Sequence, residues 1–281
     1  MRKHAWLFTA LILMFTVFSF SASLRNDISI LQQERQIRDL SPESVTLVFY
    51  VNITNASKRI YYLSGYSYRF VVKGTEYLRL ETALDESISV GAQGDILVAV
   101  PVKITYSHLF RVIPGIQEDG DAVCYLTGEM RFSDGRKDRG SLPIGLSGEF
   151  PIFKKPEIEF VLLHAKTLTF AGADLDVDVA FKNSNGFELL IDNITYQLEL
   201  EGYTVGEGTI SGDNNIAKSG QRVFSLPFLL NFYEVGKEVH SVLQQESAGC
   251  RISGKIIVQT IWERLTIPFD ERGTIKIIRP S

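Results

Sequence analysis

Hydrophobic and polar residues alternate along several stretches of the chain, which is the pattern of strands with one buried face. The two clearest stretches are residues 45–53 and 175–181, in which every second residue is Val, Leu, Ile or Phe. Each stretch runs into a polar turn, at residues 52–57 and 182–186. The pattern therefore predicts two strands, each followed by a tight turn.

Further elements follow both strands in the same order. The other predicted strands are residues 61–72, 96–104, 122–132 and 142–152 in the first half, and 189–200, 223–230, 251–262 and 265–278 in the second. Between the third and fourth strands of each half, residues 106–112 and 232–245 predict a short helix, with Gly249 as the stop of the second one. Asp134-Gly135 predicts a hairpin turn.

The two halves are copies of one unit, because the same residue types recur at nearly constant spacing. The matched pairs are Pro101 and Pro227, Cys124 and Cys250, and Gly128 and Gly254, each separated by 126 residues, and then Tyr68 and Tyr196, Gly74 and Gly202, and Asn55 and Asn185, at slightly larger spacing. Small length changes of this kind are expected where loops differ between repeats.

The repeated residue types favour a structural role. Proline has no N–H for a strand ladder, so Pro101 and Pro227 are expected on an edge strand or at a bulge. The glycines Gly74, Gly94, Gly202 and Gly220 are expected at turn positions with positive φ. Asn55 and Asn185 suit tight turns because an Asn side chain bonds to its own backbone.

Length, pattern and composition together predict a mainly β (α+β) protein with two tandem antiparallel β-sandwich domains, each of about seven strands and one short helix. The expected domains are residues 28–153 and 157–279, joined by a linker at 153–156. Each is large enough to bury a core without disulfides or metals. The net charge of −4 argues against nucleic acid as a partner.

The N-terminus has the order of a secretory signal peptide. Arg2 and Lys3 precede an uncharged apolar run at residues 5–20, and small residues follow up to Ser23. Residues 1–23 are therefore expected to be a signal peptide cleaved after Ser23, which places the mature protein in the periplasm or outside the cell. The alternative is an uncleaved signal anchor that keeps the protein on the membrane.

Three short motifs in the second half resemble the WHy (water stress and hypersensitive response) domain of type 2 late embryogenesis abundant proteins. They are a strand ending in an Asn-rich turn at residues 177–185, a Tyr-containing strand closing on Gly at 194–202, and a Gly turn leading to a strand with an internal Pro at 219–227. The first half carries the counterparts at 51–55, 68–74 and 93–101. The usual Pro between two Asn residues is Ser184 in one copy and Thr54 in the other, where Ile53 replaces the leading Asn.

The resemblance implies an α+β sandwich of about seven strands and one helix, and a role in desiccation or stress tolerance. It implies no catalytic residues, because the family has none to carry over. A non-enzymatic, exported protective or binding protein is the leading hypothesis. No partner is identified; other proteins or a membrane surface under water stress are the candidates.

The sequence predicts no catalytic, cofactor or metal site. His108, His164 and His240 are scattered, and no HxxxH or GxSxG spacing occurs, which disfavours a hydrolase. The carboxylates of residues 174, 176 and 178 share one strand face and could suit calcium, but no Ca²⁺-loop pattern follows, and a solvated face explains them. The acidic cluster at residues 118–121 is interpreted as a solvated turn.

Cys124 and Cys250 occupy equivalent positions one domain apart, so buried free thiols are expected although export would permit a disulfide. Sequons occur at Asn52, Asn55 and Asn193.

An adhesive or carbohydrate-binding sandwich is the alternative function. It would use exposed aromatic residues, for which the candidates are Tyr61, Tyr62, Tyr66 and Trp262. Tyr61 and Tyr62 are neighbours on one strand and cannot both face inward. An exposed aromatic groove would favour this alternative, whereas a polar surface would favour the protective role.

Overall fold

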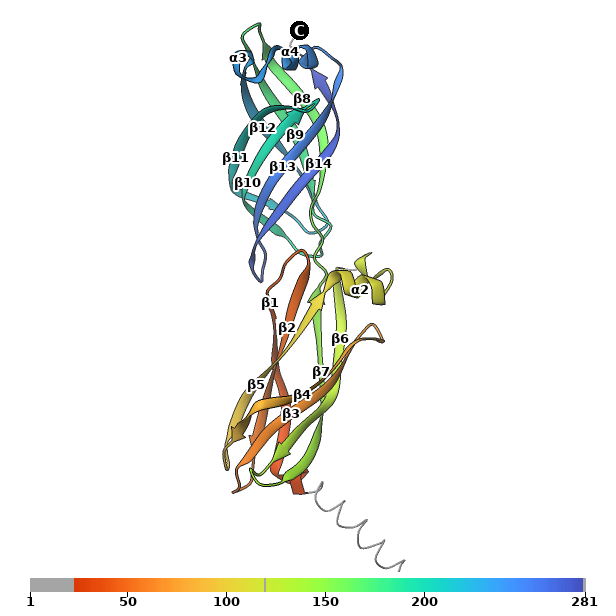
Figure 1. Ribbon diagram of the computed structural model, residues 1–281, viewed down its shortest axis with the longest axis vertical. Helices are drawn as coiled ribbons and strands as arrows, with labels where there is room; N and C mark the ends of the chain where they lie inside the picture. The colour runs from red at the N-terminus through yellow and green to blue at the C-terminus, as the bar shows by residue number, and fades with distance from the viewer. Residues whose placement is uncertain (1–22, 119, 280–281) are drawn as a thin grey trace, which may run out of the picture. The chain divides into compact units, whose positions relative to one another are not determined.

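The computed structural model describes residues 23–118 and 120–279 of the chain. The expected signal peptide lies outside the described residues except for Ser23. The described residues form two compact units (Figure 1). Unit 1 comprises the residues up to Arg38 together with Ser44–Phe150, and unit 2 comprises Asp39–Glu43 and the residues from Pro151 onward.

The expected linker at residues 153–156 belongs to unit 2. Phe153 is buried and its ring lies 6.2 Å from the ring of Phe187. The backbone N–H of Lys154 donates to Asn185 Oδ1 at 2.7 Å, and Asn185 Nδ2 donates to the Lys154 carbonyl at 2.8 Å. These contacts hold the segment against unit 2.

Unit 1 is built of strands with one short helix and one turn of 3-10 helix. Its elements are β1 (Ile28–Arg38), β2 (Ser44–Asn55), β3 (Tyr61–Val72), β4 (Thr75–Val90), β5 (Asp95–Thr105), α2 (Tyr106–Val112), η1 (Ile116–Glu118), β6 (Asp121–Ser133) and β7 (Asp138–Pro151). The predicted helix at 106–112 is confirmed as α2. The Asp134-Gly135 hairpin is also confirmed, because it joins β6 to β7.

Unit 2 repeats this order. Its elements are β8 (Glu157–Leu168), β9 (Gly172–Lys182), β10 (Leu189–Leu200), β11 (Tyr203–Ile216), β12 (Gln221–Asn231), α3 (Phe232–Val235), α4 (Lys237–Leu243), β13 (Ser247–Gln259) and β14 (Arg264–Ile278). The helix predicted at 232–245 is interrupted at Gly236, whose φ of 98° does not fit a helix. Gly249 is not a helix stop, because it lies inside β13.

The strands of each unit form the two layers of a sandwich. In unit 1 one sheet has the order β1-β2-β5 and the other β4-β3-β6-β7. Unit 2 has the corresponding orders β8-β9-β12 and β11-β10-β13-β14, joined into one sheet by a short parallel contact of Ile277 and Ile278 with β8. The other strand pairs described are antiparallel. The predicted mainly β class with antiparallel sheets is therefore confirmed.

Strand alternation places the core between the layers. In unit 1 the inward-facing side chains include Phe49 of β2, Phe70 of β3, Val100 of β5 and Leu126 of β6, none of which has measurable exposure. Burying each such side chain contributes about 1.5–3 kcal/mol relative to leaving it exposed. This core fixes which face of every strand reaches solvent.

Both prolines lie on edge strands, as predicted. Pro101 is in β5 opposite Val48, and β5 ends the three-stranded sheet of unit 1. Pro227 is in β12 opposite Asp176, and β12 ends the seven-stranded sheet. A residue without an N–H leaves no ladder bond unmade at such an edge, and it also hinders pairing with another strand.

Candidate functional site

The buried asparagines form the most completely bonded polar group of each unit. In unit 1, Asn55 is 1% exposed, and its Nδ2 donates to the carbonyls of Arg59, Val90 and Gly91 at 2.6, 3.2 and 2.8 Å. Its Oδ1 accepts from the backbone N–H and the hydroxyl of Ser57 at 3.0 and 2.8 Å. One side chain thus joins the end of β2 to the loops on either side of it.

Unit 2 has the same arrangement around Asn183. Its Nδ2 donates to the carbonyls of Phe187, Ile216 and Ala217 at 2.8, 3.1 and 3.1 Å. Its Oδ1 accepts from the backbone N–H and the Nδ2 of Asn185 at 3.0 and 2.9 Å. The described buried side-chain nitrogen and oxygen atoms all have hydrogen-bond partners. This network therefore stabilises the fold and leaves no unpaired donor or acceptor for a ligand.

The hydrogen bonds correct the matching of the repeats, because Asn183 is the counterpart of Asn55. The backbone N–H of Asn55 donates to the Gly94 carbonyl, and that of Asn183 donates to the Gly220 carbonyl, both at 2.8 Å. Asn185 therefore corresponds to Ser57, and the first copy keeps the leading Asn that Ile53 was thought to replace. One length change then accounts for the whole spacing, since β4 has 16 residues and β11 has 14.

Two of the four predicted glycine turns are confirmed. Lys73 and Gly74 have φ of 48° and 81°, and Glu201 and Gly202 have 46° and 85°, as a type I′ hairpin requires at both central positions. At the other two turns the prediction was wrong, because the positive φ belongs to the preceding residues. These are Gln93, before Gly94, and Ser219, before Gly220.

The repeated Tyr and Gly residues face one another across neighbouring strands. Tyr68 pairs with Gly128, and Tyr196 pairs with Gly254. A Cβ on Gly128 would lie 1.9 Å from the Ser67 carbonyl oxygen, and one on Gly254 would lie 1.9 Å from that of Thr195. Both positions therefore need glycine for close strand approach.

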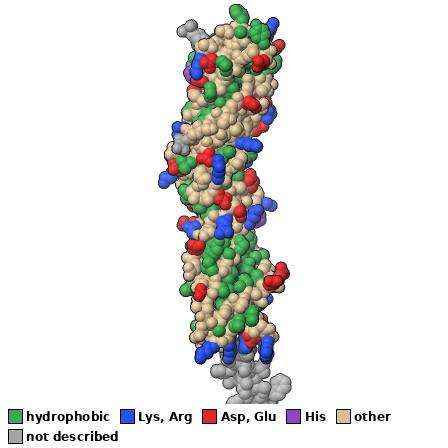
Figure 2. Space-filling view, turned by 90° about the vertical axis from the view of Figure 1, so that its left-hand side faces the viewer, with side chains coloured by type: hydrophobic (Ala, Val, Ile, Leu, Met, Phe, Trp, Pro, Cys, Tyr) green, Lys and Arg blue, Asp and Glu red, His purple; other side chains and the backbone are tan. Residues whose placement is uncertain are grey.

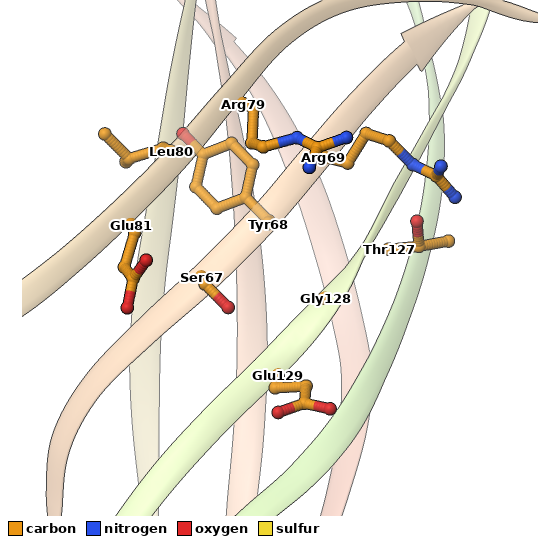
Figure 3. Close-up of a pocket in the computed structure, with 9 residues that line it drawn as sticks. All are labelled: Ser67, Tyr68, Arg69, Arg79, Leu80, Glu81, Thr127, Gly128 and Glu129. Carbon is orange, nitrogen blue, oxygen red and sulfur yellow. The ribbon is translucent and has the colours of Figure 1, made fainter.

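A shallow hollow lies over each Tyr–Gly pair. The unit 1 hollow, about 470 Å³, is lined by Ser67, Tyr68, Arg69, Arg79, Leu80, Glu81, Thr127, Gly128 and Glu129 (Figure 3). The unit 2 hollow, about 540 Å³, is lined by Thr195, Tyr196, Gln197, Glu207, Gly208, Thr209, Ser253 and Gly254. The hydroxyl-bearing Ser67, Tyr68 and Thr127 have hydroxyl-bearing counterparts in Thr195, Tyr196 and Ser253, whereas the charges differ between the units: Arg79 corresponds to Glu207, and Glu81 to Thr209.

The unit 1 hollow can hydrogen-bond a polar molecule but lacks a nucleophile with a base. The carboxylates of Glu81 and Glu129 flank the Ser67 hydroxyl on neighbouring strands (Figure 3). Glu81 pairs with Arg131 at 3.2 Å, and Glu129 accepts from the Ser141 hydroxyl at 2.6 Å. The lining residues include neither His nor Cys. Both carboxylates are therefore interpreted as ordinary surface groups of their strands, held by Arg131 and Ser141.

Burial keeps the repeated titratable groups neutral. It raises the pKa of Tyr68 to about 12, and the Tyr68 hydroxyl donates to the Pro101 carbonyl at 3.5 Å. Burial also raises the pKa of Tyr196, whose ring packs edge-on against Phe228. These tyrosines connect the two layers of each sandwich.

The two cysteines are buried free thiols, one in each unit. Burial raises the pKa of both Cys124 and Cys250 to about 12. The Cys124 thiol donates to the Gly148 carbonyl at 3.3 Å. A thiol of this kind is inert because the nucleophilic thiolate is scarce at neutral pH.

The acidic strand face carries a Lys–Asp ion pair and an Asp–His contact. Asp176 pairs with Lys166 at 2.7 Å, Asp178 lies 3.6 Å from His164 Nε2, and the backbone N–H of Asp174 donates to Thr167 Oγ1. No group of three His, Cys, Asp or Glu side chains in residues 23–118 and 120–279 is placed to hold a metal ion. In the acidic cluster at 118–121, Asp119 lies outside the described residues.

One end of unit 2 exposes large apolar side chains that the sequence pattern did not single out. Phe170, Leu229 and Tyr233 are 95%, 88% and 85% exposed, and together they are called the apolar end. The unit 1 residues at the positions of Leu229 and Tyr233 are Lys103 and Ser107. Because both units fold alike with polar residues there, the fold itself does not need these apolar groups.

A stack of rings lies at the apolar end. The ring of His240 lies 6.1 Å from that of Phe170 and 5.2 Å from that of Phe232. The backbone N–H of Phe232 donates to the Ala171 carbonyl at 2.9 Å, which joins the β8–β9 turn to the start of α3. His240 is therefore a half-buried residue that packs against both rings. Hydrophobic side chains are visible at the upper end of Figure 2.

Residues 178–273 match the model of the family described as late embryogenesis abundant protein. This part of unit 2 is therefore a late embryogenesis abundant type 2-like domain. No curated protein matches the chain significantly. No helix in the described part of the chain is long and apolar enough to cross a membrane.

Several solved structures match this chain at low identity. A protein from Archaeoglobus fulgidus is 12% identical over 44% of this chain and 94% of its own, with a TM-score of 0.32. A Mobiluncus mulieris adhesin is 9% identical over 81% of this chain and 80% of its own, with a TM-score of 0.28. Red sea bream transglutaminase is 12% identical over 89% and 32%, with a TM-score of 0.26. At these scores none of the three indicates a function for this chain.

Proposed function

We propose that this chain is a non-enzymatic, exported tandem protein of the late embryogenesis abundant type 2 kind, which protects other proteins during water stress. The family match in unit 2 carries the proposal. Unit 1 supports the tandem arrangement because it has the same strand order and the same Asn, Tyr–Gly and edge-Pro features. The expected leader at residues 1–23 supports export to the periplasm or the cell exterior.

The polar chemistry of both units supports a role without catalysis. Catalysis needs a nucleophile, base or metal cluster held within hydrogen-bond reach. The hollows bring together hydroxyls, amides and paired carboxylates, and the thiols are buried and protonated. The aromatic candidates for carbohydrate binding are buried or half-buried and line neither hollow. The exposed rings of Phe170 and Tyr233 also lie outside both hollows, so neither hollow is an aromatic groove that would support a carbohydrate-binding module.

The surface that we assign to client contact is the apolar end. A drying enzyme partly unfolds and exposes apolar segments, which aggregate unless another apolar surface covers them. Phe170, Leu229 and Tyr233 offer such a surface, and the last two lie within the family-matched residues. Exposed Lys237 and Glu238 beside them bear opposite charges, so the apolar end does not select clients by charge.

A dehydration assay tests the proposal. A labile enzyme is dried and rehydrated with the purified protein at a low molar ratio, and its recovered activity and light scattering are measured. The wild-type chain is expected to preserve most of the activity that drying alone destroys. The double variant Leu229→Lys with Tyr233→Ser, which carries the unit 1 residues at these positions, is expected to protect severalfold less well at the same molar ratio.

The matched control is Leu97→Lys, because Leu97 is also an exposed apolar residue (58% exposed) but lies in β5 of unit 1. It should protect as the wild-type chain does. If the wild-type chain protects no better than an equal mass of serum albumin, the protective role is wrong. If Leu97→Lys weakens protection as much as the double variant, protection belongs to general surface hydrophobicity and not to the apolar end.

A further inference from the structure

One end of unit 1 carries a group of exposed basic side chains. They come from the residue run before β1, the β2–β3 loop and the β6–β7 hairpin, and are together called the basic end: Arg25, Lys58, Arg59, Arg136 and Lys137. Figure 2 shows Lys and Arg side chains gathered at the lower end of the view. The chain as a whole has a net charge of −4, so this local excess of positive charge runs against its overall balance.

Hydrogen bonds and contacts show that these three segments meet at one end. The backbone N–H of Ala56 donates to the Asp27 carbonyl at 2.8 Å, and the Tyr61 hydroxyl donates to Asp27 Oδ2 at 2.5 Å. A Cβ on Gly135 would lie 3.2 Å from the ring of Tyr62. The residue run before β1, the β2–β3 loop and the β6–β7 hairpin are therefore neighbours in space.

The acidic residues at this end are engaged by their own turns. Asp134 accepts from the backbone N–H groups of Arg136 and Lys137 at 3.0 and 2.8 Å, and also from the Arg139 guanidinium. These bonds lower the pKa of Asp134 to about 2. No carboxylate among the described residues forms an ion pair with the five basic side chains of the basic end. The carboxylates of Asp27 and Asp138 also lie in these segments, where they accept from the Tyr61 hydroxyl and the Gly140 N–H. The basic side chains outnumber the carboxylates, so the basic end keeps a net positive charge.

Unit 2 provides an internal comparison at the same backbone positions. The counterparts of Lys58 and Arg59 are Gly186 and Phe187. At the hairpin, Arg136 and Lys137 correspond to Trp262 and Glu263. These two loops thus fold with no basic residue in unit 2, so their fold in unit 1 does not require the four positive charges. The run before β8 carries Lys154 and Lys155, so the third segment is basic in both units.

We propose that the basic end docks unit 1 on the surface of an anionic phospholipid bilayer. Residues 1–22 support a bilayer as the partner. They precede the described fold, shortly before Arg25, and contain the apolar run at 5–20. Such a segment engages a membrane both as a leader and as a retained anchor. The basic end is thus the part of the fold closest along the chain to the membrane segment, and basic side chains near an anionic surface bind it electrostatically. This docking does not rest on the protective role.

Vesicle binding tests the proposal with the chain that begins at Leu24. The fourteen strands of the described residues all lie after Leu24, so their pairings are kept. The protein is mixed with sucrose-loaded vesicles of phosphatidylglycerol and phosphatidylcholine, or of phosphatidylcholine alone, and the bound fraction is measured after sedimentation. Binding is expected only to the anionic vesicles and should weaken as salt rises.

Charge removal at the basic end gives the decisive comparison. The variant with Gln at 58, 59, 136 and 137 is expected to lose about fivefold in binding constant per removed charge. The control variant loses the same number of exposed basic residues elsewhere, at Lys103, Arg111, Lys218 and Lys237. It should bind almost as the unsubstituted chain does. Equal loss in both variants, or equal binding to neutral vesicles, would overturn the proposal.

The full-length chain gives a second measurement with an internal control. After reconstitution into the same vesicles, brief acetylation of lysines is followed by mass spectrometry. Lys58 and Lys137 should be labelled severalfold more slowly in anionic than in neutral vesicles, whereas Lys103 and Lys218 should react alike in both. Unchanged labelling of Lys58 and Lys137 would show that the basic end does not contact the anionic surface.

Discussion

Replacing Asn183 by Ala should destabilise unit 2 strongly, because its buried side chain connects three segments through five hydrogen bonds. The substitution removes donation to three carbonyls and acceptance from Asn185. Asn183 has no exposed surface, so water cannot replace these partners without opening the loop. Each hydrogen bond contributes about 0.5–1.5 kcal/mol net, and one Nδ2 proton is shared between two carbonyls. The free energy of unfolding of unit 2 is therefore expected to fall by about 3 kcal/mol.

Trp262 makes this loss measurable in unit 2 alone. The chain has two tryptophans, Trp6 and Trp262, so a chain that begins at Leu24 reports through Trp262. Its ring lies 4.9 Å from that of Phe187, whose carbonyl accepts from Asn183. With a urea m-value of about 2 kcal/mol/M, the unfolding midpoint should fall by about 1.5 M.

Two control substitutions decide whether the reasoning holds. Asn193→Ala removes one hydrogen bond, to the Ser211 hydroxyl at 3.1 Å, and should shift the midpoint by less than about 0.5 M. Asn55→Ala should cost unit 1 a similar 3 kcal/mol or so and leave the Trp262 transition in place. A shift for Asn183→Ala no larger than that for Asn193→Ala would refute the network argument.

Two further predictions follow from the interior. Gly254→Ala should cost about 3 kcal/mol or more, because its Cβ would meet the Thr195 carbonyl oxygen at 1.9 Å, whereas Gly145→Ala, with nothing within 4 Å, should change the melting temperature little. Because burial raises the pKa of Cys124 and Cys250 to about 12, the unfolded chain loses these protons first; the stabilisation is complete below about pH 9 and declines as pH rises to 12. The urea midpoint should fall between pH 8 and 11, and less steeply after Ala replaces both cysteines; a flat midpoint would contradict this.

Most of the strand order could be predicted from the sequence, because alternation marks strands with one buried face. The strands at 61–72 and 189–200 were predicted with the bounds that the structure shows. β1 and β4 were not assigned because many of their side chains are exposed, and both strands are interrupted by register shifts. A pattern that depends on burial gives little signal in such a strand.

The repeat could be predicted from the spacing of matched residues, but the two copies could not be aligned correctly at the Asn-rich turn. Asn183 and Asn185 are both Asn, so sequence alone could not say which one corresponds to Asn55. The backbone bonds to Gly94 and Gly220 decide it. The split between α3 and α4 was missed for a similar reason, because the sequence pattern does not show that Gly236 adopts a φ of 98°.

The apolar end and the basic end could not be predicted from the sequence pattern, because each is formed by loops that are far apart in sequence. They became visible through comparison of the two units, which place different side chains on matching backbone positions. The interior positions keep their chemistry: Tyr68 and Tyr196 each oppose a glycine.

At the ends the chemistry changes while the backbone does not. Lys103 becomes Leu229, and Arg136 becomes Trp262. Since the described buried polar atoms already have partners, the interior offers a ligand nothing to bind. Side chains that differ at equivalent, exposed positions are free of folding demands, so they are where the two units can take on separate tasks. On this argument an exchange of Lys103 with Leu229 and of Ser107 with Tyr233 should move client contact between the units and leave the stability of both sandwiches nearly unchanged. The counterparts of the basic end include Phe187 and Trp262, whose rings pack together, so the same exchange there would also cost stability.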